Sequence, residues 1–324
     1  MSGAPATSGM IRIEGRDFAM GSARFYPEEA PVRRVRVDGF WIDAAPVTNR
    51  QFAAFVRETG YVTEAEIAPD PRDYPGMPAS MAKAGSLVFQ PPKGPVSLDA
   101  PLSWWAFTFG AHWRKPYGKG SSTLNLQDHP VVHVSYRDAE AYAAWAGKSL
   151  PTEAEWELAA RGGLEDAEFA WGDELAPDGR MMCNYWQGVF PGQNLRLDGF
   201  ERTSPVRRFP PNGHGVYDLI GNVWEWTSDW WSLPIPKGPG CCVPTNPRGG
   251  AMEGSLDPTQ PQTPIPRKVL KGGSHLCAEN YCQRYRPAAR IPQTIESATS
   301  HVGFRCVIRA ANRPRDSEVG RSAG

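Results

Sequence analysis

The chain has 324 residues, of which 40% are hydrophobic, and its 35 Lys and Arg residues balance 35 Asp and Glu residues. This length can fill one large or two ordinary domains, and a net charge of zero argues against nucleic acid as a partner. The first residues lack the basic stretch and apolar core of a signal peptide, and no window is apolar enough to span a membrane. We therefore expect a cytoplasmic protein with no membrane or nucleic-acid partner.

Alternating apolar and polar residues predict strands over 10–20 and 33–42. Three capping boxes then predict helix starts, and glycines at 60, 147 and 162 predict the matching ends. The boxes are Thr48 with Gln51, Ser135 with Asp138, and Thr152 with Glu155.

Glycine and proline, at 33 and 32 residues, predict many loops, and 12 tryptophans supply the burial that short elements cannot. Residues 66–127 and 234–266 show little periodicity and are expected to be long loops. The predicted fold class is a loop-rich α+β domain over residues 10–311, with a flexible start at 1–9 and a disordered tail at 312–324.

Two cysteines, Cys277 and Cys282, stand five positions apart in a polar segment that opens with glycines. We expect them near a surface cleft, with Arg284, Arg286 and Arg290 supplying the positive field that favours a thiolate. Such a pair can close a disulfide or hold one soft ion such as Cu(I), whereas Zn²⁺ asks for more ligands than this segment offers. The spacing alone leaves a structural disulfide or two buried thiols open.

Four phrases in the chain resemble the formylglycine-generating enzyme (sulfatase-modifying factor) family in the family's own order. The resemblance covers roughly residues 10–310 and implies that family's fold, which is distantly similar to C-type lectins. The phrases are Leu-Pro-Thr-Glu-Ala-Glu-Trp-Glu at 150–157, Gly-Asn-Val-Trp-Glu-Trp at 221–226, Lys-Gly-Gly-Ser at 271–274 and Gly-Phe-Arg-Cys at 303–306.

The cysteine pair carries the functional part of the resemblance, because the family's generators share Gly-Gly-Ser-x-x-Cys-x-x-x-x-Cys. Ser274, Cys277, Tyr281 and Cys282 match it. The resemblance implies oxidation of the cysteine in a Cys-x-Pro-x-Arg segment of an unfolded or nascent sulfatase to Cα-formylglycine. It implies O₂ and an external thiol as co-reactants and Cu(I) held by the two cysteines, which suits two soft donors.

Ser274, Tyr281 and Trp224 are implied to line the pocket. A mixed disulfide between Cys282 and the substrate is the alternative to copper ligation and stays open here.

The family also implies two structural Ca²⁺ sites built from loop oxygens, the ligands that this ion prefers. The first is expected at Asn184, Tyr185, Asp198 and Phe200, and the second at Asp218, Gly221, Val223 and Glu225.

This chain departs from secretory relatives at Ala143, Ala160 and Pro287, where those relatives carry disulfide cysteines. Cys306 is therefore without the cysteine that would be its disulfide partner in those relatives. That departure fits a reducing compartment. His301 stands where many relatives carry asparagine, and we expect a satisfied core or rim histidine there.

Two competing functions use the same scaffold. A non-heme iron sulfoxide synthase would need a carboxylate that Ser135 replaces after His129 and His133, and Pro130 would break the helix that carries them. A non-catalytic lectin-like binding protein would not need the cysteine pair at all.

Overall fold

The computed structural model describes residues 7–72, 74, 76–233, 242–262 and 264–309. The predicted disordered tail therefore lies outside the described residues, as do most of the predicted flexible start and part of the loop expected at 234–266.

Short helices and strands joined by long loops make up the described chain, which confirms the α+β class. Its α-helices are α1 (Asn49–Thr59), α2 (Tyr136–Trp145) and α3 (Glu153–Ala160). Its strands are β1 (Met10–Ile13), β2 (Arg16–Met20), β3 (Arg33–Val37), β4 (Phe40–Asp43), β5 (Gly85–Phe89), β6 (Trp105–Phe109), β7 (Trp224–Trp230), β8 (Arg267–Lys271), β9 (Arg290–Thr294), β10 (Val302–Gly303) and β11 (Val307–Arg309).

All three predicted helix starts are confirmed. The Thr48, Ser135 and Thr152 side chains each accept a hydrogen bond from the backbone N–H three residues on, at 3.3, 3.2 and 3.1 Å. Because these caps satisfy N–H groups that a helix leaves open, short helices can form beside long loops. Gly60 ends α1 with φ 71°, a left-handed conformation that suits glycine.

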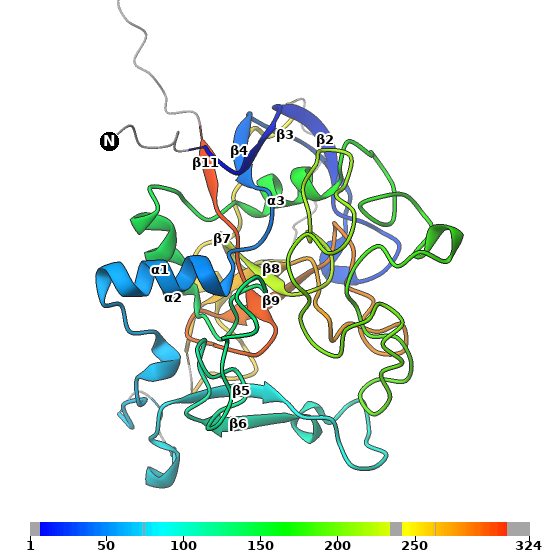
Figure 1. Ribbon diagram of the computed structural model, residues 1–324. Helices are drawn as coiled ribbons and strands as arrows, with labels where there is room; N and C mark the ends of the chain where they lie inside the picture. Colours follow the sequence, from blue (N-terminus) through cyan, green and yellow to red (C-terminus); the bar gives the residue numbers. More distant parts are fainter. Residues whose placement is uncertain (1–6, 73, 75, 234–241, 263, 310–324) are drawn as a thin grey trace, which may run out of the picture.

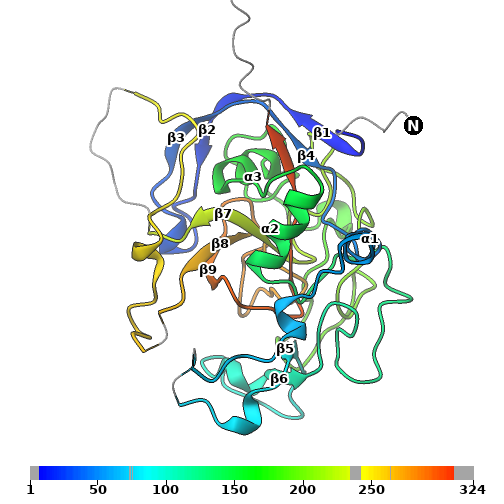
Figure 2. The same ribbon diagram turned by 90° about the vertical axis from the view of Figure 1, so that its left-hand side faces the viewer.

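The strands form four separate sheets, and the central one positions the cysteine loop. Its order is β10-β7-β8-β9, with β8 and β9 antiparallel and β10 parallel to β7. A second sheet, in the order β1-β4-β11, brings the two ends of the described chain together. In both views the β1–β4 region lies above the central sheet and the β5–β6 hairpin lies below it (Figures 1 and 2).

Two expectations about the strands were wrong. The strands predicted over 10–20 and 33–42 are each two strands, because residues 14–15 and 38–39 pass between the pairing of β1 with β4 and the pairing of β2 with β3. The long loop predicted over 66–127 contains the hairpin β5–β6, five residues in each strand. Residues 90–104 separate these strands, so no short turn signal announces the pairing.

Helix α3 lies between the sheets and contacts β2, β3, β7 and β8. Its Trp156 is fully buried and donates from Nε1 to the Glu225 carboxylate of β7 at 2.8 Å. Arg305 donates to the same carboxylate at 2.7 Å, and Arg305 and Glu225 are both buried. Buried, hydrogen-bonded charges thus connect α3, β7 and the segment before β11, which do not pair with one another as strands of one sheet. None of the described helices has the length and apolar character needed to cross a membrane.

Candidate active site

The cysteine loop, residues 272–289, joins β8 to β9, and two glycines set its course. Gly272 and Gly273 have φ of 94° and 73°, a region that other residues rarely adopt. A Cβ on Gly272 would lie 2.6 Å from the Leu219 carbonyl oxygen, and one on Gly273 would lie 2.7 Å from the Arg284 carbonyl oxygen. The Gly-Gly pair is therefore required for the loop to fold back on itself.

This loop brings the two sulfurs together. Cys277 Sγ lies 3.0 Å from Cys282 Sγ, well beyond the disulfide bond length of about 2.05 Å, so both are thiols. Cys277 is only 2% exposed, whereas Cys282 is half-buried. The expectation that both thiols lie near a surface cleft was wrong for Cys277, because the loop folds its first half into the main apolar cluster.

The two thiols differ in acidity. Burial raises the pKa of Cys277. The pKa of Cys282 is lowered to about 7, chiefly by the hydrogen bond from the Cys277 thiol and also by the charge of Arg284, although burial acts in the opposite direction. Cys282 is therefore the more acidic thiol of the pair, with Cys277 as its hydrogen-bond donor. The backbone N–H of Ser274 also donates to Cys277 Sγ at 3.5 Å.

Arg284 is the cation that faces Cys282, with Nη1 3.9 Å from the sulfur. The N-terminal segment holds it there: Glu28 accepts from Nη2 at 2.7 Å, and the guanidinium lies 3.7 Å from the centre of the Tyr26 ring. Sequence reasoning missed Tyr26 and Glu28, because more than 250 positions separate them from Arg284 and no local pattern connects them.

The other two arginines expected to supply the positive field do not face the sulfurs. Arg286 forms a buried ion pair with Glu29 at 2.6 Å. Arg290 forms one with Glu153 at 2.7 Å. Their charges are neutralised within the fold, so the sequence was right about Arg284 and wrong about this pair.

The remaining predicted pocket residues have distinct positions. Ser274 is fully buried, and its hydroxyl accepts from the Leu276 N–H at 3.2 Å as a turn hydroxyl does. Tyr281 is 37% exposed and stands at the rim beside Cys282. Trp224 is buried in β7 and belongs to the same apolar cluster as Cys277.

An aromatic cluster that the sequence did not predict holds Tyr281. Its ring stacks on Phe190 at 4.6 Å and 7° and meets Trp104 edge-on at 5.4 Å. The Asn280 side chain both accepts from the Phe190 N–H and donates to its carbonyl, each at 3.1 Å. The rim of the site is therefore rigid on this side.

The histidines near the site are engaged as structural groups. His275 contacts the Asn222 carbonyl through Nδ1 at 2.8 Å, and His301 contacts Thr299 through Nδ1 at 2.8 Å and lies against Trp105. Burial lowers the pKa of both, to about 4 and about 3. The satisfied rim histidine expected at position 301 fits this arrangement.

The pair considered for an iron site is also engaged. His133 contacts Ser86 through Nδ1 at 2.7 Å and the Pro116 carbonyl through Nε2 at 2.8 Å, and His129 contacts Thr203 at 3.0 Å. Because both ring nitrogens of His133 have partners inside the fold, these imidazoles do not form an open iron site.

At the first expected Ca²⁺ site, the Gln187 amide nitrogen contacts both the Tyr185 carbonyl and the Asp198 carboxylate. Burial raises the pKa of Asp198, and no described cation forms an ion pair with it. Two of the four expected ligands thus meet around one amide. The other two are placed differently: Asn184 donates to the Arg202 carbonyl at 2.8 Å, and the Phe200 N–H donates to Asp198 at 2.9 Å.

At the second expected site, Asp218 is half-buried, and desolvation of its carboxylate is the main cause that raises its pKa to about 6. Glu225 differs, because both of its oxygens accept from Arg305, at 2.7 and 2.8 Å. Gly221 and Val223, expected to offer carbonyls, lie in the buried turn that precedes β7. The structure thus leaves Asp218 without an ion-pair partner among the described residues, while Glu225 is already neutralised.

A family model described as a sulfatase-modifying factor enzyme 1-like domain matches residues 2–310. The chain belongs to the sulfatase-modifying factor family. It is 51% identical over 301 residues to a Mycobacterium tuberculosis protein named formylglycine-generating enzyme, covering 92% of this chain and 97% of that protein. A Streptomyces coelicolor protein of the same name is 47% identical, covering 93% and 89%.

The family also contains a member named as inactive. A Bos taurus protein named inactive C-alpha-formylglycine-generating enzyme 2 is 37% identical over 95% of this chain and 90% of that protein. Family membership therefore does not by itself decide activity, which depends on the residues of the site.

Solved structures agree on the fold. PvdO from Pseudomonas aeruginosa superposes with a TM-score of 0.60 at 22% identity, covering 93% of this chain and 94% of that one. Treponema denticola variable protein 1 gives a TM-score of 0.58 at 19% identity, covering 93% and 95%. These structures confirm the predicted fold of the family.

Proposed function

We propose that this chain is a formylglycine-generating enzyme that oxidises the cysteine of a Cys-x-Pro-x-Arg segment in a sulfatase polypeptide to Cα-formylglycine. The observation that carries the proposal is the contact between the Cys277 and Cys282 sulfurs at 3.0 Å, with a guanidinium facing the more exposed sulfur. An unfolded or nascent client fits best, because the segment must reach a half-buried sulfur.

The residues present fit a Cu(I) ion. Two thiol sulfurs are the soft ligands that this ion prefers. The two sulfurs lie 3.0 Å apart on one loop, so Cys277 and Cys282 would be the residues that hold a single ion. The imidazole of His275, two residues before Cys277, has its Nδ1 engaged with a backbone carbonyl, so it does not compete through that atom.

Copper held by Cys277 and Cys282 would supply the O₂ activation that side chains alone cannot provide. The chain's own groups prepare the sulfurs: Arg284 stabilises the Cys282 thiolate, and the Ser274 N–H donates to Cys277. Tyr281 and the rings around it wall the site and limit the access of water. In the net reaction the client Cβ becomes an aldehyde carbon and its sulfur leaves as H₂S. O₂ is reduced to two water molecules by two electrons from the client cysteine and two from a pair of external thiols, which leave as a disulfide. Water then supplies the aldehyde oxygen as H₂S leaves.

A reducing, cytoplasmic setting is part of the proposal. Cys183 and Cys306 are buried free thiols, which fits a compartment where stable disulfides are uncommon.

The decisive experiment incubates the reduced protein with copper, O₂, a thiol and a peptide that contains Cys-x-Pro-x-Arg, and detects aldehyde by mass spectrometry. Cys282→Ser should abolish aldehyde formation, whereas Cys306→Ala, which removes a buried thiol elsewhere, should retain it. No aldehyde from the wild-type chain would refute the assignment. Unchanged peptide binding by Cys282→Ser, with no turnover by either form, would favour the lectin-like binder.

Copper ligation and a mixed disulfide make different predictions in the same assay. Copper ligation predicts about one copper ion per wild-type chain, lost in Cys277→Ala, and inhibition by a Cu(I) chelator. Full activity at far less than one copper ion per chain would favour the mixed disulfide.

We also propose structural Ca²⁺ at the two loop sites, supported by the carboxylates of the buried Asp198 and the half-buried Asp218. Neither has an ion-pair partner among the described residues. Ca²⁺ added to chelator-treated protein should raise the melting temperature, as expected for an ion that binds only the folded chain. Asp198→Asn should reduce that rise. A melting temperature that does not respond to Ca²⁺ would contradict the proposal.

A further inference from the structure

A pocket of about 270 Å³ beside the cysteine loop takes no part in the reaction described above. Phe89 and Trp186 form its aromatic wall, and both are buried. Residues 192–194 form its edge, and Arg196, Glu201 and Arg202 bring charge to it. Because one water occupies about 30 Å³ of liquid, the pocket has room for an amino-acid side chain.

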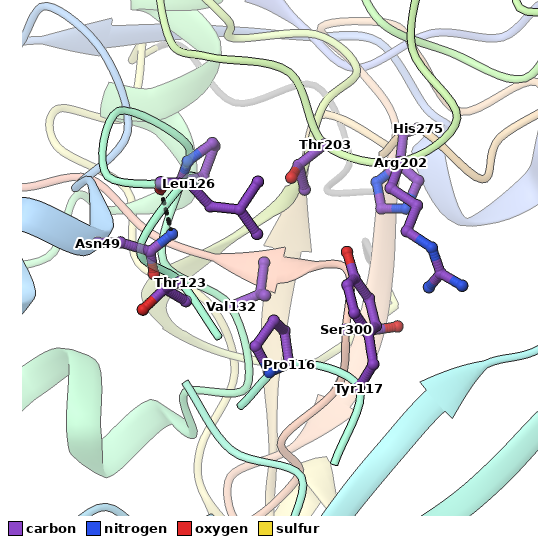
Figure 3. A pocket seen from close by; sticks show the side chains of 11 residues that line it. Asn49, Pro116, Tyr117, Thr123, Leu126, Val132, Arg202, Thr203, His275 and Ser300 are labelled. Atoms are coloured by element: carbon purple, nitrogen blue, oxygen red, sulfur yellow. Dashed lines mark hydrogen bonds between the residues drawn. The ribbon is translucent and has the colours of Figure 1, made fainter. Parts of the chain in front are cut away.

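The charges in this pocket do not balance. Arg196 pairs with Glu201 at 3.2 Å, and both are exposed. Arg202 is half-buried and forms no ion pair with any described carboxylate: its guanidinium donates to the Phe89 carbonyl at 3.5 Å and lies 4.2 Å from the Tyr117 ring centre. Figure 3 shows this side chain on the opposite side of a neighbouring small pocket from Asn49. The pocket therefore carries one uncompensated positive charge.

The pocket is rigidly joined to the cysteine loop. The Trp186 N–H donates to the Cys277 carbonyl at 2.9 Å. The Phe89 ring lies 5.7 Å from the Phe190 ring, which in turn stacks on the Tyr281 ring at 4.6 Å. About two layers of aromatic rings thus separate the pocket from the residue beside Cys282.

We propose that this pocket binds an acidic side chain of the client polypeptide, outside the Cys-x-Pro-x-Arg core, through an ion pair with Arg202. The identity of the client rests on the proposed function. The Phe89, Phe190 and Tyr281 rings follow one another at 5.7 and 4.6 Å. An extended chain advances about 3.3 to 3.6 Å per residue, so a client residue a few positions from the reacting cysteine can reach past these rings. The arginine of the core motif has the wrong charge for this pocket. A small thiol bound here would be too short to reach the sulfurs across the rings.

Exposed apolar side chains beside the pocket fit a bound polypeptide. Val189 and Leu195 are 62% and 52% exposed on the loop that forms the pocket edge. They offer apolar contact to an extended client segment, while Arg202 supplies the charge recognition.

The test measures binding without turnover. Fluorescent peptides that carry the core motif, with its cysteine replaced by serine, receive Glu or Gln at each flanking position in turn, and their dissociation constants are measured by anisotropy. We expect Glu at one position to bind about threefold to fivefold tighter than Gln, as for a partly exposed ion pair. Arg202→Gln should remove this preference, Arg202→Lys should retain most of it, and Arg202→Glu should shift it to Lys.

Arg34→Gln is the matched control, because it removes an exposed arginine, paired with Glu165, from β3 at the other end of the molecule. It should leave the Glu preference intact. A flat scan in the wild-type chain, or a Glu preference that survives in Arg202→Gln, would overturn the proposal. Failure of a cysteine-containing peptide to yield aldehyde while the Arg202-dependent preference persists would contradict the proposed function and not the pocket.

Discussion

The two cysteines of the site are five positions apart in sequence, yet their surroundings give them different chemistry. Cys277 is enclosed by the apolar cluster, which favours the neutral thiol, whereas Cys282 faces Arg284 and accepts from its partner. Acidity is thus a property of position in the fold and not of the spacing.

This difference predicts selective alkylation of the reduced, metal-free protein. Because the pKa of Cys282 is lowered to about 7, its reaction with iodoacetamide should rise between about pH 6 and 8 and then level off. Cys277, with a raised pKa, should stay unmodified over that range. Peptide mass spectrometry after short labelling pulses measures both sites.

Glu28→Gln gives the corresponding control, because it keeps the shape of the side chain that holds Arg284 but removes its charge. The midpoint of the curve of Cys282 labelling against pH should move by a fraction of a pH unit, and the curve should keep its shape. Equal labelling of Cys277 and Cys282 at pH 7 would contradict the assignment of thiolate and donor.

At the scale of an element, the turn that follows β8 depends on glycine for two separable reasons, a left-handed backbone and a close approach. Gly273 has φ 73° and would place a Cβ 2.7 Å from the Arg284 carbonyl. Gly110 has a nearly identical φ of 71°, but nothing lies within 4 Å of its Cβ position.

Gly273→Ala and Gly110→Ala therefore share the backbone strain, about 1 kcal/mol, and differ in the clash. Gly110→Ala should lower the free energy of unfolding by roughly that amount and retain aldehyde formation. Gly273→Ala should cost about 1 to 3 kcal/mol more and reduce turnover, since the loop that carries both sulfurs must move. Urea denaturation and the peptide assay measure the two effects, and equal losses in both variants would show that the close approach does not matter.

The elements also show which local signals are reliable. The three capping boxes predicted the helix starts because their hydrogen bonds involve residues only three apart. The β5–β6 hairpin escaped prediction because its strands pair across 15 intervening residues, without a two-residue turn.

At the scale of the whole molecule, buried ion pairs connect α3 to the central sheet. Glu157 of α3 accepts from Lys271 of β8 at 3.0 Å and from Arg161 at 2.8 Å, and all three residues are buried. Burial alone would raise the pKa of Glu157, but the two cations outweigh it and lower the pKa to about 2.

Glu157→Gln should therefore destabilise the protein by about 3 to 5 kcal/mol at neutral pH, because it removes the nearest carboxylate from two buried cations and leaves Lys271 only Glu153, at 3.6 Å. A carboxylate whose pKa falls on folding contributes stability above its unfolded value of 4.5, and the contribution is lost as the pH falls toward about 2. The difference between wild type and variant in urea denaturation should accordingly shrink below about pH 4.5.

Asp128→Asn is the surface control, since its pair with Arg50 is well exposed, and it should cost less than about 1 kcal/mol. A Glu157→Gln variant as stable as this control would show that the buried pairs do not hold the sheets together.

The sequence by itself determined the fold class, the helix starts and the cysteine pair with its glycine turn, because each depends on residues close together in the chain. Only the tertiary structure decided which arginine faces a sulfur, since Glu28, Glu29 and Glu153 select among Arg284, Arg286 and Arg290 from distant segments. The tertiary structure also determined the aromatic wall beside Tyr281 and the uncompensated charge of Arg202. Ring contacts and charge balance depend on which distant side chains meet, and no local spacing records that.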